Sequence, residues 1–206
     1  MNKLKKCLRC ATFIIIIVFI LIESFLILKK EFQNDTFYSI KIGEYLTQNG
    51  LNSLKTDVFS WHDGLEYCNP HWLNDILIYF SYYLGEFLGV YILTYIEVVI
   101  LGILIFYIAY RESKNRWLSA IIALFSIYIL QSFLAARAQL ISYIIFALEV
   151  YFLTKYIYQN QKRYIVRIMY FSFNFGKYSY GSISNIFSII FAIYSRRINC
   201  KIFKNR

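Results

Sequence analysis

The sequence is poor in proline, glycine and charge. Among 206 residues there are 1 proline and 8 glycines, and 17% are Asp, Glu, Lys or Arg. A typical soluble domain carries about 25% charged residues. Collagen-like chains need glycine at regular positions, and disordered chains need high charge with few apolar residues, so both classes are excluded. Instead, 59% of the residues are hydrophobic and 20% are aromatic. This composition excludes a soluble domain and is typical of a membrane protein.

The cysteines are too scattered for a disulfide framework. Cys7 and Cys10 form a single CxxC pair, while Cys68 and Cys200 lie alone. Without a second pair or a nearby histidine, the CxxC pair does not predict a zinc site, and the βαβ context of a thioredoxin-type motif is missing. Two readings remain for this pair: small residues beside a membrane span, or juxtamembrane sites of S-acylation.

Apolar runs long enough to cross a bilayer recur along the chain. Residues 11–28 form a run of 18, about 27 Å as a helix. No small-residue cleavage site follows it, so we expect an uncleaved anchor after a basic segment, 1–10. Three further transmembrane helices are expected within 87–158, at 87–110, 117–134 and 140–158. The sequence therefore predicts an all-α, polytopic integral membrane protein with four transmembrane helices.

An outer loop, residues 29–86, separates the first expected span from the second, and its first part, 29–72, is hydrophilic. Within it, apolar residues at helical spacing predict an amphipathic helix over 36–48 on the membrane surface, ended by Asn49-Gly50. Residues 73–84 are apolar but only 12 long, which favours a second interfacial helix over a span. The residues at helical spacing are Tyr38, Ile42, Tyr45 and Leu46.

Basic residues predict the orientation. The net charge of +10 does not indicate nucleic acid as a partner, because the basic residues stand in short clusters between apolar runs. If 73–84 does not cross the membrane, then up to Arg167 the cytoplasmic segments hold 11 Lys and Arg and the outer segments hold 5. If it does cross, the two numbers exchange. The positive-inside rule favours the first arrangement, with a cytoplasmic N-terminus in the cell membrane and an extracytoplasmic loop at 29–86.

Asp35 is the candidate general base. It follows the first expected span by seven residues, so its carboxylate would stand close to the bilayer and within reach of water. The structural alternative is an N-cap that accepts a hydrogen bond from the amide of Phe37 or Tyr38. Further along the loop, three more acids are either functional or simply solvent-exposed carboxylates: Asp57, Asp63 and Glu66.

Arg137 is the candidate anion-binding residue. It lies in a short outer turn, 135–139, where the positive-inside rule makes an arginine unexpected, and its planar fork suits a phosphate. Snorkelling of an interfacial arginine is the alternative. His62 and His71 lack the spacing of a local metal motif. The apolar runs also contain Glu23, Glu97 and Glu149, which are either functional carboxylates or neutral groups bonded to a neighbouring span.

Four segments resemble the protein-mannosyltransferase and lipid-linked-sugar branch of the GT-C glycosyltransferase superfamily. They are 35–45 (DTFYSIKIGEY), 56–61 (TDVFSW), 70–75 (PHWLND) and 137–142 (RAQLIS). Two departures stand out: Ala138 replaces a usual proline, and Pro70-His71 stand where His-Glu is common. The resemblance covers residues 10–160, and the order of its segments agrees with the topology above.

The resemblance implies a transferase that moves a sugar from a polyprenyl-phosphate donor to an acceptor hydroxyl on the outer membrane face, with inversion. In that family an acidic residue early in the first outer loop removes the acceptor proton, which would be Asp35. Arg137 is the cation expected at the leaving phosphate. The further substrate-binding candidates are Asp57, Trp61, His71 and Trp72. A metal ligand set is not predicted, and a divalent cation as cofactor stays open because branches of the superfamily differ.

A different reading is a non-catalytic membrane protein, either a truncated remnant or a small accessory subunit. Family members have many more spans, so a second chain carrying the remaining spans is an expected partner. The last 57 residues hold 10 Lys and Arg and no acid, and 168–195 are interrupted by polar residues and glycine. We therefore expect 159–206 to be a basic, acid-free tail that departs from the family fold, as a frameshift or early stop in a longer gene would produce.

The predicted topology can be tested by cysteine labelling. With Cys68 removed, a cysteine at position 52 should react with an impermeant thiol reagent in intact cells, because residues 29–86 are expected outside. A cysteine at position 114 should react only after permeabilisation, because 111–116 are expected inside. Labelling at 114 but not at 52 would show the inverted orientation.

Overall fold

The computed structural model describes residues 2–28, 32–51, 56–62, 64–67, 69, 71–159, 163–164 and 166. Within these residues the fold is helical, and the extended structure is one isolated bridge between Thr56 and Glu66. The elements are α1 (Asn2–Ile27), α2 (Asn34–Asn49), α3 (Trp72–Ser113), α4 (Arg116–Leu130), the 3₁₀ turn η1 (Gln131–Phe133) and α5 (Ala138–Gln159).

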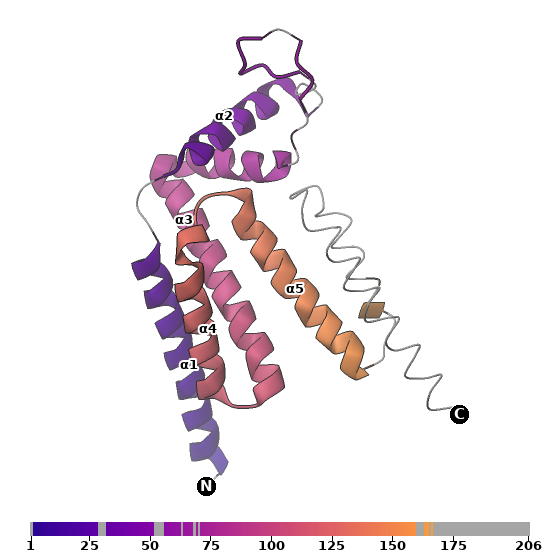
Figure 1. Ribbon diagram of the computed structural model, residues 1–206. Coiled ribbons are helices and arrows are strands. Elements are labelled where there is room, and N and C mark those ends of the chain that lie inside the picture. The colour runs from indigo at the N-terminus through magenta and orange to yellow at the C-terminus, as the bar shows by residue number, and fades with distance from the viewer. Residues whose placement is uncertain are drawn as a thin grey trace, which may run out of the picture.

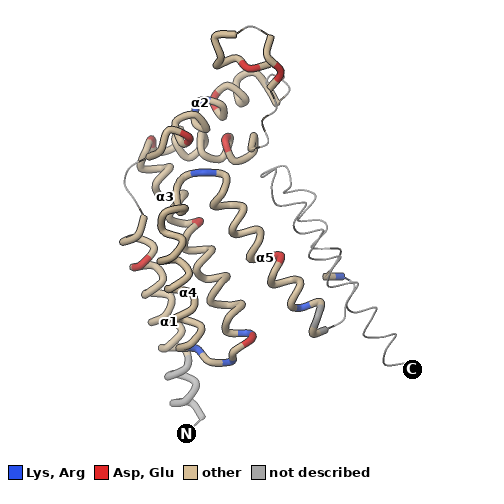
Figure 2. Tube along the Cα trace, viewed as in Figure 1, with Lys and Arg blue, Asp and Glu red and all other residues tan. Residues whose placement is uncertain are grey.

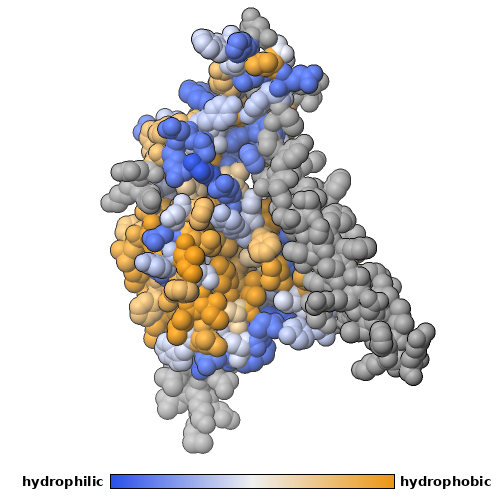
Figure 3. Space-filling view, in the orientation of Figure 1, coloured by the Kyte–Doolittle hydropathy of each residue, from blue (hydrophilic) through white to orange (hydrophobic). Residues whose placement is uncertain are grey.

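Four of the described helices, α1, α3, α4 and α5, are long and apolar enough to cross a membrane. This confirms the predicted class, an all-α polytopic integral membrane protein. In Figure 1 these helices run along one another, and α2 lies across one end of the bundle, here called the α2 end. The other end, where α3 connects to α4, is called the opposite end. Figure 3 shows hydrophobic residues over the spans and hydrophilic residues around α2.

α3 is bent into two arms. Its 42 residues would extend for roughly 63 Å if straight, about twice the hydrocarbon thickness. At Gly85 and Glu86 the backbone leaves the helical region, with φ −155° and φ 51° respectively. The first arm, 72–84, lies beneath α2, and the second arm, 87–113, crosses the bundle (Figure 1). Gly89 permits the sharp bend, because a Cβ there would stand 2.0 Å from the Ser81 carbonyl oxygen.

The bundle core gathers where α1, α3 and α4 cross. Ile20, Leu101 and Ile127 are fully buried there. Gly102 lets the three helices approach, because a Cβ would stand 2.6 Å from Ile127 Cδ1 and 2.9 Å from Ile20 Cγ2. Small residues at such crossings are a general device of membrane helix packing. This core holds the second arm of α3 in place and thereby sets the position of the first arm.

α2 packs on the first arm of α3. Its buried residues include Ile40, which contacts Ile78, while Ile42 and Leu46 form a second cluster against Trp72. The apolar stripe that we expected to face the membrane surface therefore faces protein, because the short arm of α3 offers an apolar partner. Tyr38, at one end of the predicted stripe, is exposed.

Most observed helix ends differ from the predicted ends by a few residues, but α1 begins at Asn2, nine residues before the expected start at 11. α2 runs Asn34–Asn49 against the predicted 36–48 and ends at Gly50, whose φ is 85° and whose N–H donates to the Leu46 carbonyl. α4 ends at Leu130 and continues as η1, where a helix to 134 was expected. Cys10 is an exposed free thiol. Outside the described residues lie Asp63, Cys68, Pro70, Cys200 and the tail from 167 onward.

Gly43→Ala should destabilise the packing of α2 on α3. A Cβ at this position would stand 2.2 Å from the Asp75 carbonyl oxygen and 2.5 Å from Tyr79 Cβ. In an open helix, Gly→Ala gains about 1 kcal/mol, whereas overpacking costs about 1–3 kcal/mol. We therefore expect a lower thermal unfolding midpoint in detergent, and Gln48→Ala, on the exposed side of α2, should leave it unchanged or raise it. An increase for Gly43→Ala would contradict the close contact.

Candidate functional site

The site begins where the first turn of α2 meets the turn between η1 and α5. The Thr36 hydroxyl donates a hydrogen bond of 3.1 Å to the Ala136 carbonyl, and both residues are buried. Ala136 also joins Ile40 and Val90 in one apolar cluster. A buried hydroxyl and carbonyl are costly to leave unpaired, so this bond fixes α2 against the turn. Asp35 precedes Thr36 and Arg137 follows Ala136, so the bond also brings Asp35 and Arg137 face to face.

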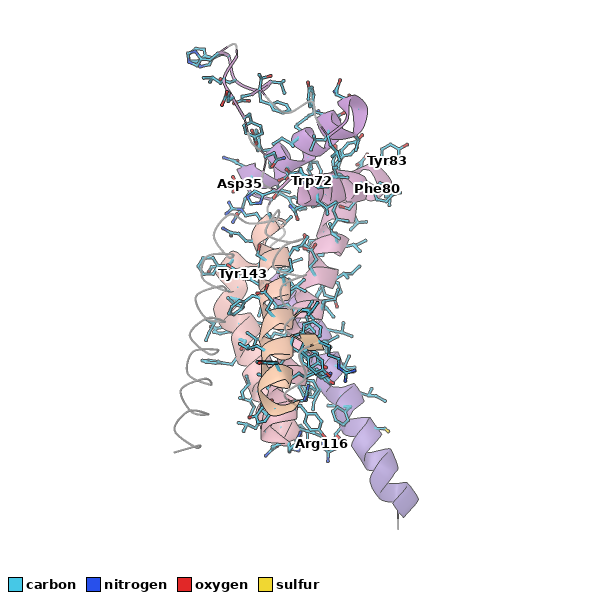
Figure 4. All side chains as sticks on the ribbon, turned by 90° about the vertical axis from the view of Figure 1, so that its right-hand side faces the viewer. Asp35, Trp72, Phe80, Tyr83, Arg116 and Tyr143 are labelled. Carbon is cyan, nitrogen blue, oxygen red and sulfur yellow. The ribbon has the colours of Figure 1, made fainter. Side chains whose placement is uncertain are left out.

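Asp35 and Arg137 form an ion pair. The distance between Arg137 Nη2 and Asp35 Oδ2 is 3.0 Å, although the two residues are 102 positions apart. The Asp35 side chain is 66% exposed and the Arg137 side chain 32% exposed. Figure 4 places Asp35 at the α2 end, directly above the spans. The N-cap alternative for Asp35 is wrong, because Gln33 is the N-cap and Asp35 lies inside the first turn.

The ion pair lies at the edge of a cleft of about 220 Å³. α2 contributes Asp35 and Tyr38, and the start of α5 contributes Gln139. From the segment before α3 and its first turn come polar groups that include His71 and Asp75. The described lining residues are Asp35, Tyr38, Ser39, Ile42, Tyr67, Asn69, His71, Asp75, Arg137, Ala138 and Gln139.

Asp75 supplies a second carboxyl group to the cleft. It lies in the first arm of α3, before the bend at Gly85 and Glu86, and is only 3% exposed. The Asn69 side-chain amide donates to Asp75 Oδ2 at 2.7 Å. Burial raises the pKa of Asp75, while hydrogen bonds from Asn69 and Ser39 and the charge of His71 act in the opposite direction. The cleft therefore holds one exposed carboxylate against a cation and one buried carboxyl group whose pKa is raised by burial.

Two tyrosines complete the polar lining. The Tyr38 and Tyr67 hydroxyls lie 3.3 Å apart. Burial, together with the contact to Tyr38, raises the pKa of Tyr67, so its hydroxyl stays neutral and can donate a hydrogen bond. Phenol, amide and guanidinium groups around a cleft of this size suit a polyhydroxylated or phosphorylated ligand.

The other predicted site residues lie elsewhere, with one exception. His71 lines the cleft at the N-cap position of α3. Asp57 caps its own loop by accepting from the Phe59 and Ser60 amides at 3.0 and 3.2 Å. Trp61 is 92% exposed and contacts the His62 ring, so it does not line the cleft. Trp72 packs against the underside of α2.

A second, apolar cavity begins beside the cleft and runs between α3, α4 and α5. Its volume is about 1050 Å³. Gln139 lines both the cleft and this groove, so the two adjoin at the start of α5. Tyr143, labelled in Figure 4 on α5 below the level of Asp35, lines the groove further into the bundle. The apolar wall includes Leu101, Ile105, Ile122, Ile129, Phe146 and Val150.

Sequence reasoning missed Asp75, Asn69, Tyr67 and Gln139 as site residues. The signal for Asp75 was its place in the segment 70–75, where a carboxylate stands at the start of an otherwise apolar helix. Nothing local marks Tyr67 or Gln139, because they reach the cleft through the packing of α2 on α3 and of the turn on α2.

Glu23, Glu97 and Glu149 do not belong to the described lining of the cleft. Glu97 and Glu149 are buried within α3 and α5, and Glu23 is partly exposed on α1. Among the described residues, no group of three or more His, Cys, Asp or Glu side chains is placed to hold a metal ion.

We compared the chain with known protein families, curated proteins and solved structures. No protein family, curated protein or solved structure matches the chain.

Thr36→Val should weaken the contact between α2 and the turn. Valine keeps the shape but removes the hydroxyl, leaving the buried Ala136 carbonyl without its partner, at a cost of about 1–3 kcal/mol. Thr36→Ser keeps the hydroxyl and should cost less. Thr47→Val is the matched control, because Thr47 is exposed and bonds only to the Glu44 carbonyl of its own helix. Equal thermal midpoints for Thr36→Val and Thr47→Val in detergent would show that the bond contributes nothing.

Proposed function

We propose that this protein is a membrane glycosyltransferase, or the part of one, that takes a sugar from a polyprenyl-phosphate donor at the α2 end. The observation that carries the proposal is the Asp35–Arg137 pair at the mouth of a polar cleft that adjoins an apolar groove. An amphiphilic donor has the same two parts, a phosphorylated sugar and a long hydrocarbon chain. The resemblance of 35–45 and 137–142 to the GT-C superfamily supports the same reading.

In this proposal Arg137 binds the donor phosphate. Its Nη2 already faces Asp35, and its Nε–H is buried without an acceptor among the described residues. A guanidinium has five N–H donors, so it can hold a phosphate while it keeps Asp35 in place. A buried N–H without a partner is costly, and a phosphate oxygen would remove that cost.

Asp35 acts as the general base. Its carboxylate removes the proton of the acceptor hydroxyl as the hydroxyl oxygen attacks the anomeric carbon. The bond between that carbon and the phosphate oxygen breaks, and its electron pair stays on the phosphate beside Arg137. The products are the glycosylated acceptor, polyprenyl phosphate and the protonated Asp35. Its 66% exposure leaves Asp35 open to an acceptor that arrives from water.

The donor chain would lie in the groove between α3, α4 and α5. Its lining is apolar, with aromatic side chains at Tyr143 and Phe146. Because Gln139 borders both cavities, a phosphate at Arg137 and a hydrocarbon chain in the groove need no gap between them.

The proposed orientation places the α2 end outside the cell membrane and the N-terminus in the cytoplasm. Figure 2 shows Lys and Arg at the opposite end, in the α3–α4 connection and at the end of α5. The described residues there include Arg111, Lys114, Arg116 and Lys155, and the positive-inside rule assigns them to the cytoplasm. The cleft then faces outward, where a lipid-linked donor replaces a nucleotide sugar.

The competing function is a non-catalytic membrane protein in which the Asp35–Arg137 pair only ties α2 to the turn. This alternative is favoured by the pair itself, since each charge already has its partner at 3.0 Å. A purely structural ion pair needs both charges but no substrate. Measurements of donor binding and turnover therefore distinguish the two functions.

Asp35→Asn should abolish transfer while donor binding persists. In membranes supplied with a radiolabelled polyprenyl-phosphate hexose, we expect release of polyprenyl phosphate to fall about 100-fold or more, as for loss of a general base. Glu44→Gln is the matched control, because Glu44 lies on α2 and pairs with Lys41 outside the cleft. Full activity in Asp35→Asn would exclude the base role.

Arg137→Lys should weaken donor binding, because lysine keeps the charge but loses the planar fork. The measurement is equilibrium binding of the same labelled donor to the purified protein, with Lys41→Gln as the control cation on α2. If the unsubstituted protein neither binds nor turns over the donor, the non-catalytic alternative holds.

A further inference from the structure

A cluster of cations and tyrosines lies at the opposite end of the bundle, far along the helices from the cleft. The last two turns of α3 contribute Tyr107 and Arg111, and the last turns of α5 contribute Tyr151 and Lys155. Arg111 Cζ lies 5.3 Å and Lys155 Nζ 4.7 Å from the centre of the Tyr151 ring. The Tyr107 and Tyr151 rings pack together, with their centres 5.5 Å apart. One tyrosine ring is therefore in contact with two positive charges.

These two charges have no carboxylate partner in the described part of the chain. The ion pairs there are Lys41–Glu44 and Arg137–Asp35. Glu112, the nearest acid in sequence to Arg111, is not part of either ion pair. The sequence contains no acid after Glu149, so residues 160–206 cannot supply one.

The cations are also short of acceptors. Arg111 Nη1 is buried and has no hydrogen-bond partner among the described residues. Two like charges around one ring repel each other, and the cation–π contacts, about 0.5–1 kcal/mol each at exposed sites, do not neutralise them. An anion with several acceptor oxygens would satisfy the free N–H groups and remove the repulsion.

The depth of the cluster indicates the source of that anion. Arg111 is two residues before the end of α3, and Lys155 is one residue before the end of the apolar span Ala138–Tyr156. This is the level of the lipid headgroups, where tyrosines and snorkelling cations gather. Tyr107 is 45% exposed, so a lipid can reach the cluster from the side.

We propose that Arg111 and Lys155, held by Tyr151 and Tyr107, form a binding site for the phosphate of an anionic phospholipid. Arg111 presents its planar N–H groups to the phosphate oxygens, and Lys155 adds a point charge. The acyl chains lie along the apolar surfaces of α3 and α5. Basic pockets between membrane helices are a general means of recognising anionic headgroups. The site fixes the end of α5 to α3 through a bound lipid, and it is independent of any chemistry at the α2 end.

The test uses the full chain, delipidated in detergent and titrated with phosphatidylglycerol or phosphatidylcholine while thermal unfolding and bound lipid are measured. We expect phosphatidylglycerol to bind more tightly and to raise the unfolding midpoint. Each cation near the surface contributes about 1 kcal/mol, or roughly fivefold in affinity, so Arg111→Gln with Lys155→Gln should lose roughly 25-fold. Lys114→Gln, an exposed cation in the same connection without a ring contact, is the matched control and should bind as the unsubstituted protein does.

Two further measurements make the outcome decisive. Arg111→Lys keeps the positive charge and removes only the planar guanidinium. It should retain most of the preference for phosphatidylglycerol. That result would also show that the fold tolerates a change at this position. Glycerol phosphate, which has the headgroup chemistry but no chains, should not shift the midpoint at matched concentration. Equal binding of the two lipids, an unchanged double variant, or stabilisation by glycerol phosphate alone would overturn the proposal. No polyprenyl lipid is present, so failure here leaves the transferase proposal untouched.

Discussion

The buried hydrogen bond between Thr36 and the Ala136 carbonyl is the contact on which the arrangement of the α2 end depends. It joins the first turn of α2 to the turn between η1 and α5. A polar pair without access to water must find its partner in one geometry, whereas apolar contacts tolerate small shifts. Because the bond fixes residues 36 and 136, it also fixes their neighbours, and the Asp35–Arg137 ion pair at 3.0 Å follows from it.

The bend of α3 is the second constraint. A straight helix of 42 residues would carry its first 13 residues out of the membrane and away from every other element. The non-helical backbone at Gly85 and Glu86, with the close approach at Gly89, turns this arm across the end of the bundle. The arm then serves as the platform for α2, and the absence of a side chain at Gly43 lets the two helices touch. His71 and Asp75 enter the cleft only because of this platform.

The two ends of the molecule differ in their electrostatics. At the α2 end, the cleft carries two carboxyl groups, Asp35 and Asp75, and Arg137 is held by the first of them. At the opposite end, Arg111 and Lys155 share a tyrosine ring without a carboxylate among the described residues. The same helices connect the ends, and α5 contributes to both.

The length and hydrophobicity of the spans could be derived from the sequence, because the thickness of the bilayer sets the length of an apolar run that can cross it, whatever the run packs against. The end of α2 at Gly50 was also local, since glycine adopts positive φ without strain. Arg137 stood out because a single cation in a short turn is unusual. In contrast, Asp75, Tyr67 and Gln139 joined the cleft, and Trp61 stayed out of it, through contacts between segments up to 100 residues apart. Such contacts depend on how α3 bends and on which surfaces α2 buries, and tertiary packing alone decides both.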